Sequence, residues 1–88
     1  MKSQSVTVRC PEGLHLRVAS EIAKIAMRAE GSVHVHCEGC PRANACSVLE
    51  LLTLGATLGT PLEIVVDSPD EDSVLQALTD VFEAGGGI

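Results

Sequence analysis

Aromatic side chains are almost absent from this chain of 88 residues: Phe82 is the only one, and there is no Trp or Tyr. Proteins that bind nucleic acid usually stack bases on aromatic rings or present a basic stripe to the phosphates. This chain instead has a formal net charge of −6. We therefore expect no nucleic-acid partner, and a core built almost wholly from aliphatic side chains.

Basic residues are missing from the second half of the chain. Residues 1–42 hold all six of them against four acidic residues, a net charge of +2, whereas residues 43–88 hold eight acidic residues and no basic one, a net charge of −8. Arg17, Lys24 and Arg28 recur at helical spacing, which predicts a positive helix face that attracts an anionic ligand or an acidic partner. The same spacing is as typical of a helix face that is simply solvated.

Long apolar runs are absent as well. No segment approaches the roughly 20 apolar residues that a membrane span needs, and the polar start MKSQSVTVR lacks the pattern of a signal peptide. We expect a soluble, cytoplasmic protein that has no membrane partner. In that compartment cysteines are expected to be reduced, metal-bound or redox-active rather than in structural disulfides.

Three strands are predicted from the sequence. Residues 5–10 and 32–37 alternate polar and apolar side chains, and residues 61–67 are nearly continuous in aliphatic ones, which is typical of a central strand. The segment CEGC predicts a hairpin turn with Glu38 and Gly39 at its tip. The proline that follows at once predicts a short fourth strand at the sheet edge, because proline lacks the amide that a central strand needs.

Helices are predicted between the strands. The first runs from Leu16 to near Gly31, with one apolar stripe. A short second one begins at Ser47, which forms a capping box with Glu50. The last is capped by Ser68, has a proline at its first helical position, and stops at the terminal glycine run. Its apolar stripe consists of Val74, Leu75, Leu78, Val81 and Phe82.

The resulting order is βαββαβα, within one domain covering residues 1–88. We predict an α+β fold, a two-layer open-faced β-sandwich. Its four-stranded, mostly antiparallel sheet is covered on one face by two long helices and one short helix.

The segment GLHLRVAS places His15 and Arg17 where the first long helix begins. The first amides of a helix lack internal partners and favour anions, so a phosphate binds there readily. Histidine is a good nucleophile near neutral pH, and arginine offers a forked, permanently charged donor to phosphate oxygens. The pair therefore predicts a site that accepts a phosphoryl group.

The same segment resembles the active-site loop of the HPr phosphocarrier family of the bacterial phosphoenolpyruvate-dependent phosphotransferase system, which usually reads G-L-H-x-R-P-A. The segment NACSVLELLTLGATLGTPLEIVVDSPDEDSVLQAL is similar to the second block of that family, so the resemblance covers nearly the whole chain. It implies that His15 accepts a phosphoryl group on ring nitrogen Nδ1 from phosphorylated Enzyme I. The group then passes to an enzyme IIA-type acceptor, for sugar uptake or regulation, and Arg17 helps to hold it.

The resemblance also implies further partner contacts. Lys24 and Arg28 are expected to engage acidic partner surfaces. Ser47 matches a serine that a dedicated kinase, HPr kinase/phosphorylase, phosphorylates in many members, and a transcriptional regulator is a further possible partner. We expect a monomeric carrier with no cofactor, not an independent enzyme. The apolar docking residues implied by the resemblance are Leu16, Val48, Leu49 and Leu52.

Two positions depart from the family pattern. Val18 stands where the family has proline, which is expected to loosen the loop and reduce the efficiency of transfer. Cys46 replaces a lysine beside Ser47 and removes a positive charge from the docking surface. Because of these departures, the protein could serve a specialised partner or a regulatory branch of the system rather than general sugar uptake.

The cysteines have no place in the family pattern. Cys37 and Cys40 form a C-x-x-C pair near His34 and His36, with Cys46 five residues beyond. A zinc half-site, a reversible disulfide and plain inert thiols remain open, since no second zinc half-site is evident. The alternative function is thus a metal- or redox-responsive, or purely regulatory, binding protein that uses Cys37, Cys40, Cys46 or Ser47. An independent hydrolase is disfavoured, because Glu12 is the single acid near His15.

Overall fold

The computed structural model describes residues 1–39 and 42–84. Its elements follow one another in the order β1 (Lys2–Thr7), α1 (Leu16–Arg28), β2 (Ser32–His36), β3 (Ala43–Asn44), α2 (Val48–Thr53), β4 (Pro61–Asp67) and α3 (Glu71–Glu83). This order confirms the predicted βαββαβα arrangement. None of the helices among the described residues is long and apolar enough to cross a membrane.

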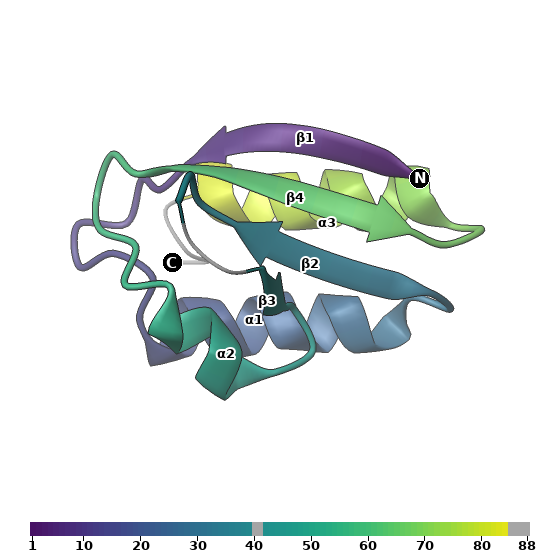
Figure 1. Ribbon diagram of the computed structural model, residues 1–88, viewed down its shortest axis with the longest axis horizontal. Helices are drawn as coiled ribbons and strands as arrows, with labels where there is room; N and C mark the ends of the chain where they lie inside the picture. Colours follow the sequence, from purple (N-terminus) through teal and green to yellow (C-terminus); the bar gives the residue numbers. More distant parts are fainter. Residues whose placement is uncertain (40–41, 85–88) are drawn as a thin grey trace.

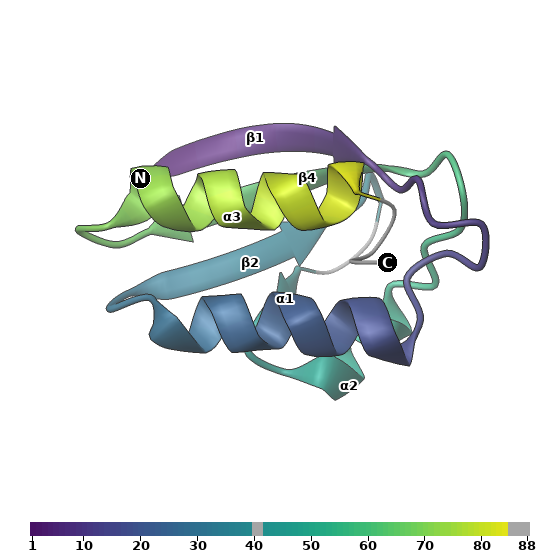
Figure 2. The same cartoon turned by 180° about the vertical axis from the view of Figure 1, so that it is seen from behind.

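The four strands form one antiparallel sheet in the order β1-β4-β2-β3. Figures 1 and 2 show the long helices α1 and α3 side by side on one face of this sheet, with α2 beyond β3. The other face is open. The structure therefore confirms the predicted open-faced sandwich.

The core lies between the sheet and the two long helices. Strand β4 is central, as predicted, and alternates its side chains so that Leu62, Ile64 and Val66 are buried while the residues between them are not. Ile22 of α1 and Leu78 of α3 are completely buried against this layer. An aliphatic core with a single aromatic residue is therefore sufficient to close the sandwich.

The first strand was predicted with the wrong bounds. It spans Lys2–Thr7 rather than residues 5–10, because pairing with β4 extends from Lys2 opposite Val66 to Thr7 opposite Pro61. The residues beyond Thr7 continue as a loop that is held to the segment before β4, with Val8 N–H donating to the Thr60 carbonyl at 3.0 Å. Cross-strand pairing sets these bounds, and local alternation does not reveal it.

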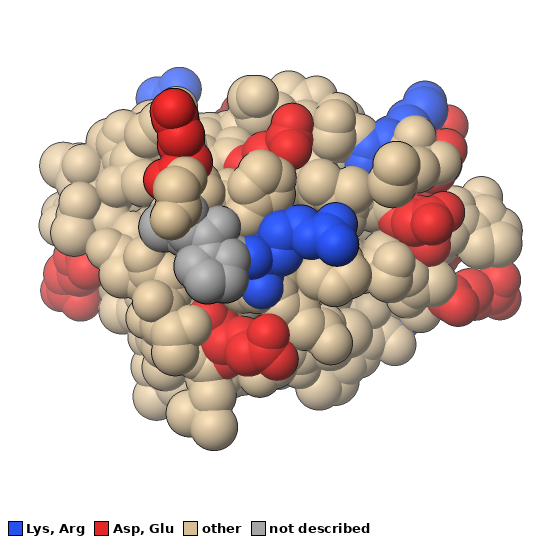
Figure 3. Space-filling view, viewed as in Figure 1, with Lys and Arg blue, Asp and Glu red and all other residues tan. Residues whose placement is uncertain are grey.

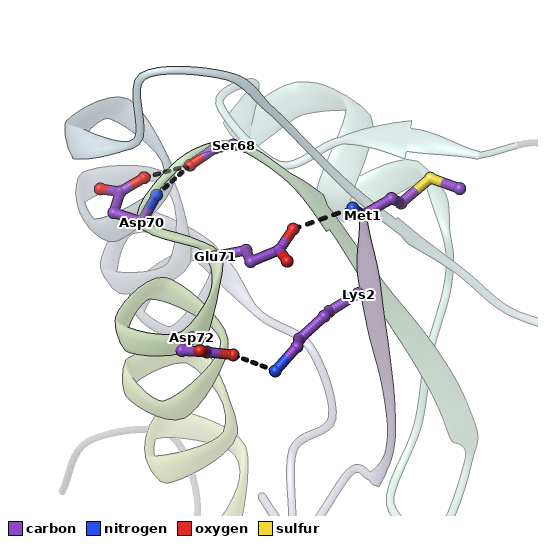
Figure 4. Close-up of polar contacts among 6 residues, drawn as sticks. All are labelled: Met1, Lys2, Ser68, Asp70, Glu71 and Asp72. Carbon is purple, nitrogen blue, oxygen red and sulfur yellow. Dashed lines mark hydrogen bonds and ion pairs between the residues drawn. The ribbon is translucent and has the colours of Figure 1, made fainter.

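The start of α3 was also predicted wrongly. The N-cap is Asp70 and the first helical residue is Glu71, so Ser68 does not cap the helix and Pro69 is not its first residue. Ser68 is buried and instead closes a turn: its hydroxyl donates to the Asp70 carboxylate and accepts from the Asp70 amide at 3.2 Å (Figure 4). The hydrogen bond from Ser68 lowers the pKa of Asp70. The terminal glycine run lies outside the described residues.

The turn between β2 and β3 agrees with the prediction where it is described. Gly39 has φ +79°, a conformation that suits glycine, and β3 is the sheet edge next to β2. Cys40 and Pro41 lie outside the described residues.

Charged groups fasten β1 to α3 at the end of the molecule where both elements begin. The Met1 ammonium lies 3.0 Å from the Glu71 carboxylate, and Lys2 pairs with Asp72 (Figure 4). The contact with Glu71 raises the pKa of the Met1 amino group, and the contact with Asp72 raises the pKa of Lys2. We call this region the distal end, because α1 begins at the opposite end of the sandwich (Figure 1).

Candidate functional site

His15 itself is the N-cap of α1. Its backbone is extended, with φ −99° and ψ −179°, and its ring Nδ1 accepts a hydrogen bond from the Arg17 amide at 3.3 Å. The imidazole thus takes the place of the usual Ser, Thr, Asp or Asn cap. Since a ring nitrogen that accepts a hydrogen bond bears no hydrogen, the hydrogen of the neutral ring is on Nε2. Nδ1 therefore carries a lone pair directed at the start of the helix.

The loop before His15 is fixed by backbone contacts. Gly13 has φ +77°, and the Leu14 amide donates to the Ala56 carbonyl at 2.9 Å. A Cβ added to Gly13 would lie 2.5 Å from that same oxygen. The sequence thus requires glycine here both for conformation and for space, and the loop before β4 sets the position of His15. Nothing in the local sequence around Ala56 signals this contact.

Arg17 is exposed and makes no ion pair with any described residue. Lys24 lies on the same side of α1, seven residues on, and is 3.7 Å from Glu21. Arg28 extends the row and is exposed. The guanidinium nearest His15 is therefore available to an incoming anion, whereas Lys24 already has a partner.

The described residues form no continuous basic patch on the open face of the sheet. In Figure 3, which views this face, the Lys and Arg side chains are scattered among acidic and uncharged residues.

Apolar side chains surround the N-terminus of α1. Leu16 is 63 % exposed and Leu49 is 77 % exposed, whereas Val48 and Leu52 are half-buried and pack against the core. We call these four residues the apolar surface; α1 and α2, which carry them, are in contact. Large exposed apolar side chains are typical of interaction sites. Met27 on α1 and Leu58 in the loop before β4 are also exposed, and sequence reasoning did not single them out.

Val18 is buried in the core as part of the inner face of α1. It occupies the third helical position, where no intrahelical amide bond is required. The substitution of the family proline therefore places an apolar side chain against the core.

Ser47 is the N-cap of α2, and its hydroxyl accepts from the Glu50 amide at 3.2 Å. The Glu50 carboxylate accepts from the Asn44 amide rather than from Ser47, at 3.1 Å. The predicted capping box is therefore half formed. The other half ties α2 to β3.

The cysteines do not form a metal site among the residues that the structure describes. Cys37 is buried and disulfide-bonded, while Cys10 and Cys46 are free. Cys40 lies outside the described residues. A disulfide-bonded sulfur is not a thiolate ligand, so this state of Cys37 does not suit zinc.

His34 and His36 are half-buried, and their neighbours on β2 are buried, so both histidines belong to the open face of the sheet, as predicted. His36 Nε2 lies 2.8 Å from a carboxylate oxygen of Glu63, its cross-strand partner. The two residues line a shallow hollow of about 300 Å³ together with Ser5, Glu38, Pro61 and Leu62. These histidines thus lie on the face of the sheet that α1 does not cover.

The fold and the site define a class of small open-faced sandwich with a histidine at the start of its first helix. The family model described as "PTS HPr component phosphorylation site" matches residues 2–84. The chain therefore belongs to the HPr phosphocarrier family of the phosphotransferase system. Membership implies partners within that system, such as Enzyme I and IIA proteins.

Relatives named "Phosphocarrier protein HPr" include those of Neisseria meningitidis and Treponema pallidum. The first is 32 % identical over 93 % of this chain and 91 % of its own length, and the second is 31 % identical over 94 % and 93 %. Among solved structures, HPr-C-His from Thermoanaerobacter tengcongensis has a TM-score of 0.91 at 25 % identity, covering 100 % of this chain and 98 % of that one.

Proposed function

We propose that this chain accepts a phosphoryl group on Nδ1 of His15 from phosphorylated Enzyme I and passes it to an enzyme IIA-type domain. The observation that carries the proposal is the Nδ1 lone pair of His15, directed at the first amides of α1. Beside it lies Arg17, which makes no ion pair with any described residue. We further propose that it acts as a single domain, as a monomer and in the cytoplasm.

The chemistry follows from the site. The Nδ1 lone pair attacks phosphorus, the Nδ1–P bond forms, and the bond between phosphorus and the donor breaks with its electron pair going to the donor. The phosphoryl oxygens then lie where helix amides donate, so the Arg17 amide transfers its hydrogen bond from Nδ1 to an oxygen. The Arg17 guanidinium neutralises the added charge. Transfer to the acceptor is the reverse displacement.

Partners are proposed to dock on the apolar surface around this site. Leu16 and Leu49 are the most exposed of its four residues, and Arg17, Lys24 and Arg28 form a basic row along α1. Such a combination of an apolar centre with charges at the rim suits acidic partners. Cys46, in place of a lysine, leaves the α2 side of this surface without a positive charge.

Regulation through Ser47 is proposed as a second property of the same surface. Ser47 is half-buried and precedes Val48 and Leu49 directly. A phosphate added by HPr kinase/phosphorylase would place negative charge beside the apolar surface and weaken docking of acidic partners, and it would offer a charged group to a transcriptional regulator.

A redox-responsive role is the second candidate function. The disulfide-bonded state of Cys37 favours it over a metal-responsive role, since the bonded sulfur is unavailable to a metal. Intact mass before and after reduction, with alkylation of the released thiols, tests it. A mass that shows all four thiols reduced after purification in air would contradict it.

The main proposal is tested by incubating the protein with phosphoenolpyruvate and Enzyme I, followed by intact mass and ³¹P NMR. We expect an acid-labile phosphohistidine that is lost in His15→Ala and retained in His36→Ala. The second variant is a matched control, because His36 is also half-buried and also near a glutamate. Phosphorylation that survives His15→Ala, or none in the folded wild type, would contradict the proposal.

A further inference from the structure

Glu12 lies on the side of the His15 ring that faces away from the helix start. One of its carboxylate oxygens is 3.9 Å from Nε2, while Nδ1 is occupied by the Arg17 amide. This distance is longer than a hydrogen bond and within the range of an ion pair. The two ring nitrogens therefore have opposite surroundings: a backbone donor at Nδ1 and a negative charge at Nε2.

The backbone holds Glu12 in this place. The Gly13 amide donates to the Cys10 carbonyl at 2.9 Å, and the His15 amide donates to the Gly13 carbonyl at 3.0 Å. These bonds, with the positive φ of Gly13, fold the loop so that residues 12 and 15 lie close together. The Glu12 side chain is 80 % exposed and no other ion pair of the described residues involves it.

Few other charges face the ring. Arg17 is the charged residue of the first turn of α1, and Glu21, further along, is engaged with Lys24. The single charged residue of α2 is Glu50, whose carboxylate accepts from the Asn44 amide. The segment from Ala56 to Thr60 has no titratable side chain. Glu12 is thus the acidic group placed to act on Nε2.

We propose that Glu12 is a positioning residue for phosphoryl transfer, acting through the Nε2–H of the His15 ring. The proposal rests on the proposed function. When Nδ1 forms its bond to phosphorus and Nε2 keeps its hydrogen, the ring acquires a positive charge, and its interaction with Glu12 becomes an ion pair. The carboxylate stabilises this form without facing the phosphoryl group, which lies on the Nδ1 side next to Arg17.

The protonated ring is the form that releases its phosphoryl group readily. When the N–P bond breaks, the electron pair returns to Nδ1, and a ring that still carries its Nε2 hydrogen leaves as neutral imidazole. A ring without that hydrogen would leave as an anion, which is a much poorer leaving group. Glu12 therefore stabilises the form of phosphorylated His15 that is a good phosphoryl donor.

The test compares wild type with Glu12→Gln, which removes the charge and keeps the size. Glu30→Gln makes the same change of charge at an exposed residue just beyond the far end of α1 and is the matched control. Each protein is phosphorylated with phosphoramidate, so that loading does not depend on Enzyme I. The hydrolysis rate of the phosphoryl group is then followed by ³¹P NMR at neutral pH.

We expect hydrolysis at neutral pH to slow by about 2- to 5-fold in Glu12→Gln, the size of effect that an exposed ion pair gives. The rate of Glu30→Gln should equal that of wild type, and the rate of Glu12→Asp should lie between those of wild type and Glu12→Gln. Equal rates for Glu12→Gln and wild type would overturn the role of Glu12 while leaving the carrier function intact. A slower rate in Glu12→Gln together with no uptake from phosphorylated Enzyme I would instead overturn the carrier function and uphold the interaction.

Discussion

The two ends of the sandwich use their charges in opposite ways. At the distal end, the Met1 ammonium and Lys2 are matched with Glu71 and Asp72, so the positive charges have partners within the chain. At the end where α1 begins, Arg17 has no ionic partner among the described residues, although acidic residues are twice as numerous as basic ones. Ion pairs within the chain hold β1 against α3 at the distal end. At the other end the Arg17 guanidinium has no such partner among the described residues and can bind an anionic ligand.

The two ends share one structural device. At each end a glycine lies against a carbonyl of another segment: Gly31 against Asp67 at the distal end, and Gly13 against Ala56 at the site. A side chain at either position would push two segments apart. The consequences differ. Gly31 directly precedes β2 and lies against Asp67 and Ser68, far from His15, whereas Gly13 sets the position of His15. A substitution at Gly31 is therefore expected to lower stability alone, whereas one at Gly13 is expected to lower both stability and the rate of phosphoryl transfer.

The largest effect is expected from Gly31→Ala. Its Cβ would lie 1.9 Å from the Asp67 carbonyl oxygen, a backbone atom that cannot move aside alone. We expect a loss of about 3 kcal/mol in the free energy of unfolding. Urea denaturation measures it. The phosphoryl transfer rate per folded molecule should be unchanged, and a specific loss of transfer would contradict the separation of the two ends.

Gly13→Ala should cost about 2 kcal/mol through the contact at 2.5 Å and the positive φ, and it should also slow transfer. Gly59→Ala is the matched control, since Gly59 has φ +89° but open space around its would-be Cβ. It should show the conformational cost alone. Equal transfer rates in the two variants would show that the contact with Ala56 does not position His15.

Arg17→Ala should slow transfer by about 10- to 100-fold, the value of one charge-assisted hydrogen bond. Stability should be unchanged because the guanidinium has no ionic partner within the described chain. Rapid-quench kinetics with phosphorylated Enzyme I gives the rate. Arg17→Lys keeps the charge and loses the forked geometry, so it should recover only part of the rate. Full recovery would mean that charge alone is required.

Leu49→Ala should weaken binding of Enzyme I by about 10-fold, the effect of truncating a moderate interface residue. Isothermal titration calorimetry measures the affinity. Val65→Ala, on the open face of the sheet and away from α2, should leave the affinity unchanged. An equal loss in both variants would place the docking surface elsewhere.

The smallest effect concerns pH at the distal end. The pKa of the Met1 amino group is raised by Glu71, so its stabilising contribution is complete below the ordinary value of 8.0 and is lost as pH rises through the higher folded value. Asp70 has the opposite sign: its pKa is lowered, so its contribution is lost as pH falls below the ordinary value of 3.8. Denaturation of wild type and Glu71→Gln from pH 7 to pH 10 should show a smaller loss in the variant. If stability falls equally with pH in wild type and Glu71→Gln, the Met1 amino group does not contribute to the pH dependence.

The sequence was sufficient for the fold because its signals are local. Apolar alternation in residues 32–37 and the stripes of α1 and α3 determine which faces are buried, and the order of elements then leaves one economical packing. The two errors have different causes. The bounds of β1 depend on its register with a distant strand, β4. The error at α3 is local, because Ser68 closes a turn with Asp70 instead of capping the helix.

The placement of His15 and Arg17 at the start of a helix was predicted for the same reason. His15 and Arg17 are adjacent to a helix start, so their chemistry is visible in a short segment. The capping bond from the Arg17 amide, the support from Ala56 and the contact of Glu12 with Nε2 depend on how the loop folds. The exposure of Met27 and Leu58 also follows only from packing.

The most direct test of the central claim is to identify the phosphorylated atom. Protein labelled with ¹⁵N in its histidine rings is phosphorylated by Enzyme I, and ³¹P–¹⁵N couplings together with ring ¹⁵N–¹H correlations assign the modified nitrogen. We predict coupling to Nδ1 of His15. A phosphoryl group on Nε2, or on His34 or His36, would contradict it.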